Sequence, residues 1–302
     1  MTSSTAVPLE VRGLVKSYAG RVAVDELGFH CRPGTVTGLL GADGAGKTTT
    51  LRILTGLTAA DRGEALVGGR RYRDLPRPGR TLGVMLDARS LHGGRTGIET
   101  LRLAARTVGV PAERAEVVLE QVGLEEAATR RVSACSPGMR RRLGIGVALI
   151  GDPAALVLDE PANGLDPDGI RWMRRLLRSF ADAGGTVLVT SHQLREMQAV
   201  VDRLVVISRG RLVREGTLEE ISLERGTRVA STDMPALRAA LDRHGIASEP
   251  RPDGQLEVSL AAEDMGRLAL REKLVLTALG DPDHAGLEDD LLALTAPTGA
   301  LR

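Results

Sequence analysis

A glycine-rich loop, GADGAGKTTT at residues 41–50, has the composition of a phosphate-binding site. In the pattern G-x-x-x-x-G-K-[ST], successive backbone N–H groups and the N-terminus of the following helix point at one anion. We expect Lys47 to neutralise the β- and γ-phosphates of a nucleotide and the Thr48 hydroxyl to ligate Mg²⁺. The plain alternative is a glycine-rich turn ahead of an ordinary helix.

The lysine in this loop stands out because the chain otherwise uses arginine for positive charge. Lys16, Lys47 and Lys273 are the only lysines among 40 basic residues. A compact ammonium fits between phosphate oxygens better than a planar guanidinium does. The lysine at this position therefore supports a phosphate site.

Two acids follow the apolar run Leu156–Leu158. We expect Asp159 to belong to the Mg²⁺ shell and Glu160 to orient or deprotonate an attacking water. Adjacent carboxylates are costly to place beside a core, which favours a functional role. The alternative is that the two acids simply lie at the solvent-exposed end of a strand.

Three further features lie in order around this acid pair. Ser136 and Pro137 are an N-cap and a favoured first-turn residue, so they open a predicted helix whose N-terminus could face an anion. Plain capping is the alternative for them. Residues Asn163–Asp166 predict a tight turn, and His192 ends a later strand, where a donor could reach a γ-phosphate.

The elements that position these residues alternate between strands and helices. Thr35–Leu40 predicts a strand before the loop, and residues 48–57 predict a helix after it. The apolar runs Ala155–Asp159 and Thr186–His192 are typical of buried parallel strands that carry function at their carboxyl ends. Thr96–Glu99 is a capping box that opens a helix. We expect an α/β fold, with hairpins over residues 8–30 and 203–216 and a helix over 139–150.

A second region follows Ile221 and carries no chemical motif. Its pattern predicts strand, helix, strand, turn, strand, helix and strand, which is a βαββαβ order typical of a small ferredoxin-like α+β unit. The expected ranges are 227–231, 235–244, 246–251, 252–254, 255–260, 262–271 and 273–279. A last helix is expected over about 287–294.

Composition limits the other functions. A net charge of +1 argues against nucleic acid as a partner, and the clusters at Arg140–Arg142 and Arg171–Arg175 are interpreted as solvated helix faces. Cys31 and Cys135 form no metal or disulfide pattern and are expected to be small buried side chains. No apolar run reaches membrane-spanning length and no signal peptide is apparent, so we expect a cytosolic chain.

Taken together, the order and spacing of GADGAGKTT, CSPGM, ALVLDEPANGLD and His192 resemble the ATP-binding cassette (ABC) family, specifically the nucleotide-binding subunits of transporters. The resemblance covers about residues 8–222. It implies a P-loop NTPase domain over residues 1–222, with a helical insert at about 98–128. Residues 223–302 then resemble the ferredoxin-like accessory domain of many drug- and antibiotic-export members.

The resemblance also implies roles for single residues. Glu160 is the general base, His192 the γ-phosphate sensor, and Tyr18 the aromatic side chain that stacks on adenine; a half-exposed surface tyrosine is the alternative for Tyr18. Ser136 and Gly138 contact ATP held by a second subunit, and Asp166 contacts that subunit. The phosphate loop comprises Gly41, Ala42, Asp43, Gly44, Ala45, Gly46, Lys47, Thr48 and Thr49.

These roles imply ATP and Mg²⁺ as cofactors and two kinds of protein partner. ATP closes a dimer of ATP-binding subunits, expected to be a homodimer, and hydrolysis releases it. A separate transmembrane permease docks on the helical insert and holds the chain at the cytoplasmic face of the membrane. We expect an ATPase that powers export of a drug-like or antibiotic compound. The alternative is a nucleotide-gated regulatory protein that powers no transport.

The sequence departs from the usual family pattern at four positions. Asp87 stands where Gln is usual; as a shorter acid it could still touch the metal, so we include it with Thr48 and Asp159 among the metal ligands. Asp43 replaces Asn in the loop. Pro137 removes a backbone donor, and Met139 stands where Gln is common. We expect hydrolysis to survive these changes, with slow turnover.

Overall fold

The computed structural model describes residues 7–223, 227–251 and 254–280. The chain divides into two compact units, with the division after Glu215. The predicted boundary lay after residue 222. The difference is the short helix α8 (Leu218–Leu223), which groups with the second unit.

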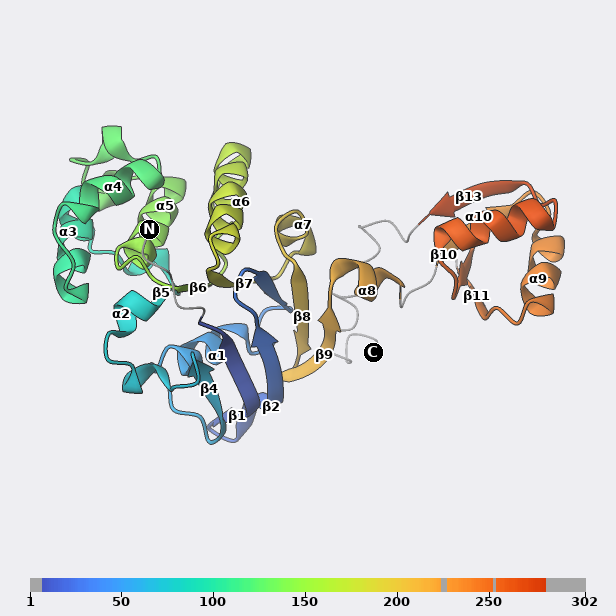
Figure 1. The fold of residues 1–302 in the computed structure, drawn as a ribbon, viewed down its shortest axis with the longest axis horizontal. Coiled ribbons are helices and arrows are strands. Elements are labelled where there is room, and N and C mark those ends of the chain that lie inside the picture. The colour runs from blue at the N-terminus through green and yellow to red at the C-terminus, as the bar shows by residue number, and fades with distance from the viewer. Residues whose placement is uncertain (1–6, 224–226, 252–253, 281–302) are drawn as a thin grey trace. The chain divides into compact units, whose positions relative to one another are not determined.

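A six-stranded sheet forms the centre of the first unit (Figure 1), and its order is β5-β6-β7-β3-β8-β9. The pairs from β5 to β8 are parallel, as the apolar runs predicted. β3, β6 and β7 are buried along their whole length, which explains their near-continuous apolar sequences. The strand bounds are β3 Val36–Leu40, β5 Leu82–Met85, β6 Ala155–Leu158, β7 Thr186–Ser191, β8 Arg203–Ser208 and β9 Arg211–Gly216.

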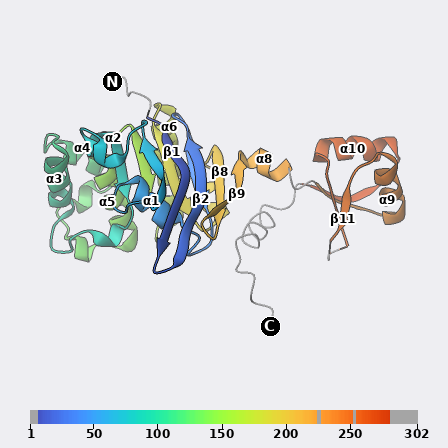
Figure 2. The same ribbon diagram turned by 90° about the horizontal axis from the view of Figure 1, so that it is seen from below.

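An antiparallel sheet of three strands, in the order β2-β1-β4, lies in the same unit (Figure 2). β1 (Leu9–Tyr18) and β2 (Arg21–Cys31) form the predicted hairpin, and β4 (Arg62–Val67) pairs with the other edge of β1. Ala19 and Gly20 both have positive φ at the turn, which is the backbone geometry that a tight two-residue hairpin needs.

Three helices group beside the sheet in both views and correspond to the predicted insert and the helix after it (Figures 1 and 2). α3 (Gly97–Val108) opens with the predicted capping box, in which Thr96 and Glu99 bond each other's backbone N–H groups. Leu101, Val118 and Leu143 pack into their shared core. The helix bounds of the unit are α1 Lys47–Leu54, α2 Pro78–Thr81, α3 Gly97–Val108, α4 Arg114–Gln121, α5 Pro137–Leu149, α6 Pro167–Asp182 and α7 Leu194–Met197.

The second unit has the predicted βαββαβ element order. Its sheet is antiparallel in the order β11-β12-β10-β13, and its core includes Val229, Leu241 and Met265. The elements are β10 Thr227–Ser231, α9 Met234–Arg243, β11 Ser248–Pro250, β12 Leu256–Val258, α10 Ala262–Arg271 and β13 Leu276–Gly280. The helix predicted over 287–294 and part of the predicted turn at 252–254 lie outside the described residues.

Candidate functional site

The glycine-rich loop connects β3 to α1 and places a buried lysine at the carboxyl edge of the central sheet. The side chain of Lys47 is 6% exposed, and its Nζ donates to the carbonyl oxygens of Gly41 at 2.6 Å and Ala42 at 3.3 Å. A Cβ on Gly46 would lie 2.5 Å from the Ala23 oxygen, and one on Gly41 would lie 2.6 Å from the Ile207 oxygen. Only glycine permits this close approach of backbones.

Asp159 is held between two hydroxyl groups. Thr48 Oγ1 donates to its Oδ2 at 2.8 Å, and Thr190 Oγ1 donates to its Oδ1 at 2.5 Å. Asp159 is 6% exposed, so these bonds compensate the carboxylate for its lost hydration. The structure thus brings together two of the three side chains that the sequence proposed as metal ligands, Thr48 and Asp159, which are 111 residues apart.

Glu160, two residues after the end of β6, adopts a left-handed backbone conformation with φ of 47°. Its N–H donates to Thr190 Oγ1 at 2.9 Å, and its Oε2 lies 3.0 Å from His192 Nδ1 and 3.4 Å from Asn163 Nδ2. Its other oxygen lies 3.5 Å from Lys47 Nζ. His192, the predicted phosphate sensor, and Lys47 of the loop therefore both approach the carboxylate of Glu160, the predicted base.

Both ring nitrogens of His192 have a partner within hydrogen-bond distance. Nδ1 lies 3.0 Å from Glu160 Oε2, and Nε2 lies 3.0 Å from the side-chain nitrogen of Gln193. The imidazole therefore lies between the predicted base and the next residue along the chain.

The predicted signature residues begin α5. The Ser136 hydroxyl caps the helix by accepting from the Met139 N–H at 3.1 Å. A Cβ on Gly138 would lie 3.2 Å from the Gly164 oxygen, so the start of α5 lies against the turn after the acid pair. At the end of that turn, Asp166 caps α6 by accepting from the Gly169 N–H at 2.7 Å.

Tyr18 ends β1 and is 47% exposed. The ammonium of Lys16 lies 5.3 Å from the centre of its ring and 2.6 Å from Asp61 Oδ1. The tyrosine face is thus supported by a fixed cation. Its stacking on adenine stays a prediction.

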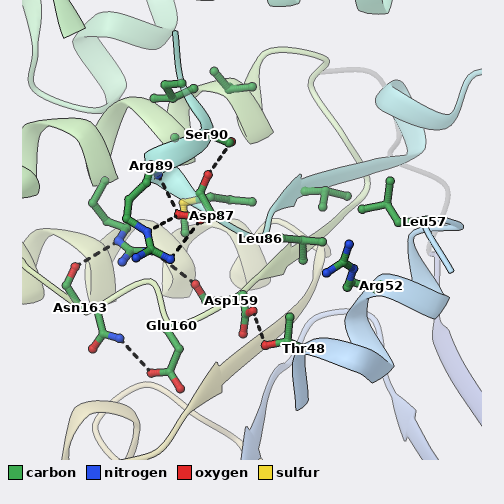
Figure 3. A pocket seen from close by; sticks show the side chains of 16 residues that line it. Thr48, Arg52, Leu57, Leu86, Asp87, Arg89, Ser90, Asp159, Glu160 and Asn163 are labelled. Carbon is green, nitrogen blue, oxygen red and sulfur yellow. Dashed lines mark hydrogen bonds and ion pairs between the residues drawn. The ribbon is translucent and has the colours of Figure 1, made fainter. Parts of the chain in front are cut away.

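A pocket of about 790 Å³ opens beside Thr48, Asp159 and Glu160 and is shown in Figure 3. Asp87 lines it, but the carboxylate of Asp87 faces Arg89, which donates its backbone N–H at 2.8 Å and its guanidinium nitrogens at 3.1 and 3.2 Å. These bonds hold the pKa of Asp87 below its usual range. Asp87 is therefore engaged with Arg89 rather than with Thr48 or Asp159, and its metal-ligand role stays a prediction.

Sequence reasoning missed Thr190 and misjudged the arginine cluster. Thr190 bonds both acids, and a hydroxyl inside an otherwise apolar strand was the available signal. The solvated-face interpretation is wrong for Arg141, whose guanidinium donates to backbone oxygens of the Asp159–Asn163 turn. Arg142 also has a partner within the chain, because its guanidinium lies 4.7 Å from the centre of the Trp172 ring.

Two features are absent from the described residues. Within residues 7–223, 227–251 and 254–280, no group of three or more His, Cys, Asp or Glu side chains is arranged to hold a metal ion. None of the helices in the same ranges combines the length and apolar character needed to cross a bilayer. Cys31 and Cys135 are free and buried, as expected.

Comparison with known proteins decides the family. The family model described as ABC transporter matches residues 24–163. Over 96% of both chains, the sequence is 33% identical to an uncharacterized ABC transporter ATP-binding protein, YhcH, of Bacillus subtilis (strain 168). The chain belongs to the ABC transporter ATP-binding proteins.

Two other relatives of this ATP-binding protein carry functional names. The daunorubicin/doxorubicin resistance ATP-binding protein DrrA of Streptomyces peucetius is 38% identical over 76% of this chain and 71% of its own length. The bacitracin transport ATP-binding protein BcrA of Bacillus licheniformis is 37% identical over 68% of this chain and 69% of its own.

Solved structures match about 70% of the chain. An ATP-binding subunit of an ABC transporter superposes with a TM-score of 0.65 at 28% identity, covering 70% of this chain and 91% of that one. A dimeric ATP-binding cassette bound to ADP and phosphate in a post-hydrolysis state gives a TM-score of 0.64 at 22% identity, which supports the fold alone. The predicted P-loop NTPase fold is confirmed. The protein is therefore an ATP-binding, ATP-hydrolysing subunit of an ABC transporter, a family whose subunits dimerise and work with transmembrane permeases.

Proposed function

We propose that this ATP-binding subunit powers export of a drug-like or antibiotic compound through a separate permease. The observation that carries the chemical part is the meeting of Lys47, Glu160 and His192 beside the Thr48–Asp159 pair. The names of DrrA and BcrA support the class of compound.

In this proposal the γ-phosphate of ATP lies beside the loop lysine. The Nζ of Lys47 now donates to backbone oxygens of its own loop, and a short movement would bring the ammonium to phosphate oxygens. Glu160 orients and deprotonates the attacking water, and the His192 imidazole donates to the γ-phosphate. The adenine stacks on Tyr18, and the loop residues 41–49 hold the phosphates through their N–H groups.

Mg²⁺ fits the Thr48–Asp159 pair. A hydroxyl and a carboxylate already within 2.8 Å supply two oxygen ligands, and Mg²⁺ usually takes its remaining ligands from water and substrate phosphates. A small protein ligand set also agrees with the finding that the described residues contain no larger acid or histidine cluster. Asp87 would have to break its hydrogen bonds with Arg89 before it could ligate Mg²⁺.

The partner subunit completes the site in this proposal. Ser136 and Gly138 at the start of α5 contact ATP held by a second copy, and Asp166 contacts that copy. The contact between the start of α5 and the turn before Asp166 supports a joint role for them, because they must move together. The permease docks on the helical insert at about 98–128, which keeps the subunit at the cytoplasmic face of the membrane.

We assign the ATP-binding domain to residues 1–222 and an accessory domain to residues 223–302. The antiparallel order β11-β12-β10-β13 with two helices supports a ferredoxin-like fold for the latter.

Glu160→Gln tests the chemical assignment. The variant keeps the shape of the side chain and removes its basicity, so we expect hydrolysis to fall at least a hundredfold while ATP still binds. With ATP and Mg²⁺ the variant should run as a dimer in size-exclusion chromatography. Glu26→Gln, which alters an exposed ion pair with Arg62, is the matched control. Unchanged hydrolysis in Glu160→Gln would remove Glu160 as the base.

Recovery of partners from membranes separates the transport motor from the regulatory alternative. The tagged Glu160→Gln subunit, held with ATP, is expected to copurify with a polytopic membrane protein. Recovery of soluble proteins alone would favour a nucleotide-gated regulator.

A further inference from the structure

The turn after β6 needs outside support to hold Glu160 in place. Glu160 has a φ of 47°, a conformation that costs a non-glycine residue free energy and persists only when its surroundings impose it. The Glu160 N–H is fixed by Thr190 from the side of β7. The opposite side of the turn, from Asp159 to Asn163, is contacted by a side chain of α5.

Arg141 supplies that support from α5. Its Nε donates to the Asn163 carbonyl oxygen at 3.1 Å, and its Nη1 lies 3.5 Å from the Asp159 carbonyl oxygen. The guanidinium thus spans the two ends of the turn that contains Glu160. A planar fork with several donors can do this, whereas the single ammonium of lysine cannot reproduce both bonds in one geometry.

The charge of Arg141 is buried among acids that line the same pocket. Burial lowers the pKa of Arg141, and the acids Asp87, Glu160 and Asp159, in that order of strength, oppose this effect. Arg89, which also lines the pocket, has the same sign of charge and is bonded to Asp87. Asp87 and Arg141 line the same pocket, and the hydrogen bonds of the Asp87 carboxylate are with Arg89.

We propose that Arg141 is a positioning residue for ATP hydrolysis, which holds the turn of Glu160 in its strained conformation. This role rests on the proposed function of Glu160 as the base. Arg141 binds protein backbone, so it acts on the placement of the base and not on the nucleotide. Its loss therefore lowers the turnover number and leaves the affinity for ATP nearly unchanged.

The first experiment compares Arg141→Gln, Arg141→Lys and the control Arg62→Gln in the full chain. Arg62 carries an exposed ion pair, so its substitution removes the same charge far from the turn in sequence. We expect kcat to fall roughly tenfold or more in Arg141→Gln, with KM for ATP within about twofold. Arg141→Lys should recover part of kcat because it keeps the charge, and Arg62→Gln should match the original protein.

A second measurement separates positioning from a structural role. Thermal unfolding of each variant is measured in parallel, and an equal loss of ATP affinity and kcat with a lower Tm would show a structural role and overturn the proposal.

The outcomes separate this inference from the one on which it rests. If Glu160→Gln keeps hydrolysis, Glu160 is not the base and the role of Arg141 falls with it. If Glu160→Gln loses hydrolysis and Arg141→Gln keeps kcat within about twofold of the original protein, the proposed function stands and the positioning role is overturned.

Discussion

The first unit buries a lysine and an aspartate, Lys47 and Asp159, whereas the buried polar side chains described in the second unit are the hydroxyls of Thr227 and Ser231. The two charges contact side chains from distant parts of the chain, which meet at the carboxyl edge of a parallel sheet. The two hydroxyls donate to the backbone oxygens of Leu260 and Val275, and the Ser231 hydroxyl also accepts from the Asp233 N–H.

This difference separates a polar interior built for chemistry from one built for packing. Buried charges lower stability unless they are paired, so a fold retains them where a reaction or a ligand requires them. A hydroxyl bonded to a backbone oxygen costs the fold little. Matched substitutions in the two units can therefore test whether the chemistry is confined to the first.

The largest difference in ATPase activity is expected between substitutions of two lysines, one in each unit. Lys47→Arg places a planar fork where a buried ammonium lies 2.6 Å from the Gly41 oxygen, so ATPase activity should fall about a hundredfold. Lys273→Arg keeps the charge at an exposed turn of the second unit and should leave the rate unchanged. Steady-state hydrolysis measures both, and a large loss in Lys273→Arg would place chemistry in the second unit.

Two buried leucines sharpen the comparison through stability. Leu188→Ala in β7 and Leu241→Ala in α9 each leave a cavity at a fully buried position and should cost about 2–5 kcal/mol in the free energy of unfolding. Urea unfolding should show this loss in both variants. ATP affinity, measured by titration calorimetry, should fall in Leu188→Ala alone; an equal fall in Leu241→Ala would show that the units are coupled.

Substitution of one buried threonine in each unit tests the contribution of its hydrogen bonds. Thr190→Val leaves Asp159 without one donor and the Glu160 N–H without its acceptor, so kcat should fall about tenfold, equivalent to ~1.4 kcal/mol in the activation barrier. Thr227→Val loses one bond to a backbone oxygen and should reduce stability by about 1 kcal/mol without changing kcat. The reverse pattern would contradict the comparison.

The smallest effect concerns acid pH. The pKa of Glu272 is lowered by His244 and Arg243, and the pKa of Glu116 is lowered mainly by Arg102. Because a lowered folded-state pKa means that protons bind the unfolded state more tightly, this stabilisation is present above about pH 4.5 and is lost as pH falls below it.

Glu272→Gln and Glu116→Gln should therefore each flatten the acid side of the stability curve slightly, one in each unit. Both ion pairs are exposed, so the change should be small and should fade at high salt. Chemical unfolding at pH 3 to 7 measures the slope. A steeper slope in either variant would contradict the assigned direction.

Much of the fold could be predicted because its signals are local. The hairpin at Ala19-Gly20, the capping box at Thr96–Glu99 and the strands β3, β6 and β7 each depend on residues close in the chain. The start of α5 at Ser136 and Pro137 was predicted for the same reason. Patterns of this kind record backbone preference and burial, which neighbouring residues decide.

The charged partners could not be predicted in the same way. Arg141 and Asn163 are 22 residues apart, and Thr190 and Asp159 are 31 apart, so their bonds depend on how α5, β6 and β7 pack. From the sequence alone, an arginine on a helix is predicted to be solvated, because the packing of neighbouring elements is not known. For Asp87, the sequence indicated a metal ligand, and the structure pairs it with Arg89 two residues away.

The sequence by itself determined the order of the elements, the phosphate loop and the family. Glycine spacing, apolar runs and acid pairs can be recognised from residues that are close together in the chain. Only the tertiary structure decided which side chains share the Glu160 carboxylate and which arginine fixes its turn. The reason is that the parallel sheet gathers strand ends that are far apart along the chain, and pairing between such residues leaves no local pattern.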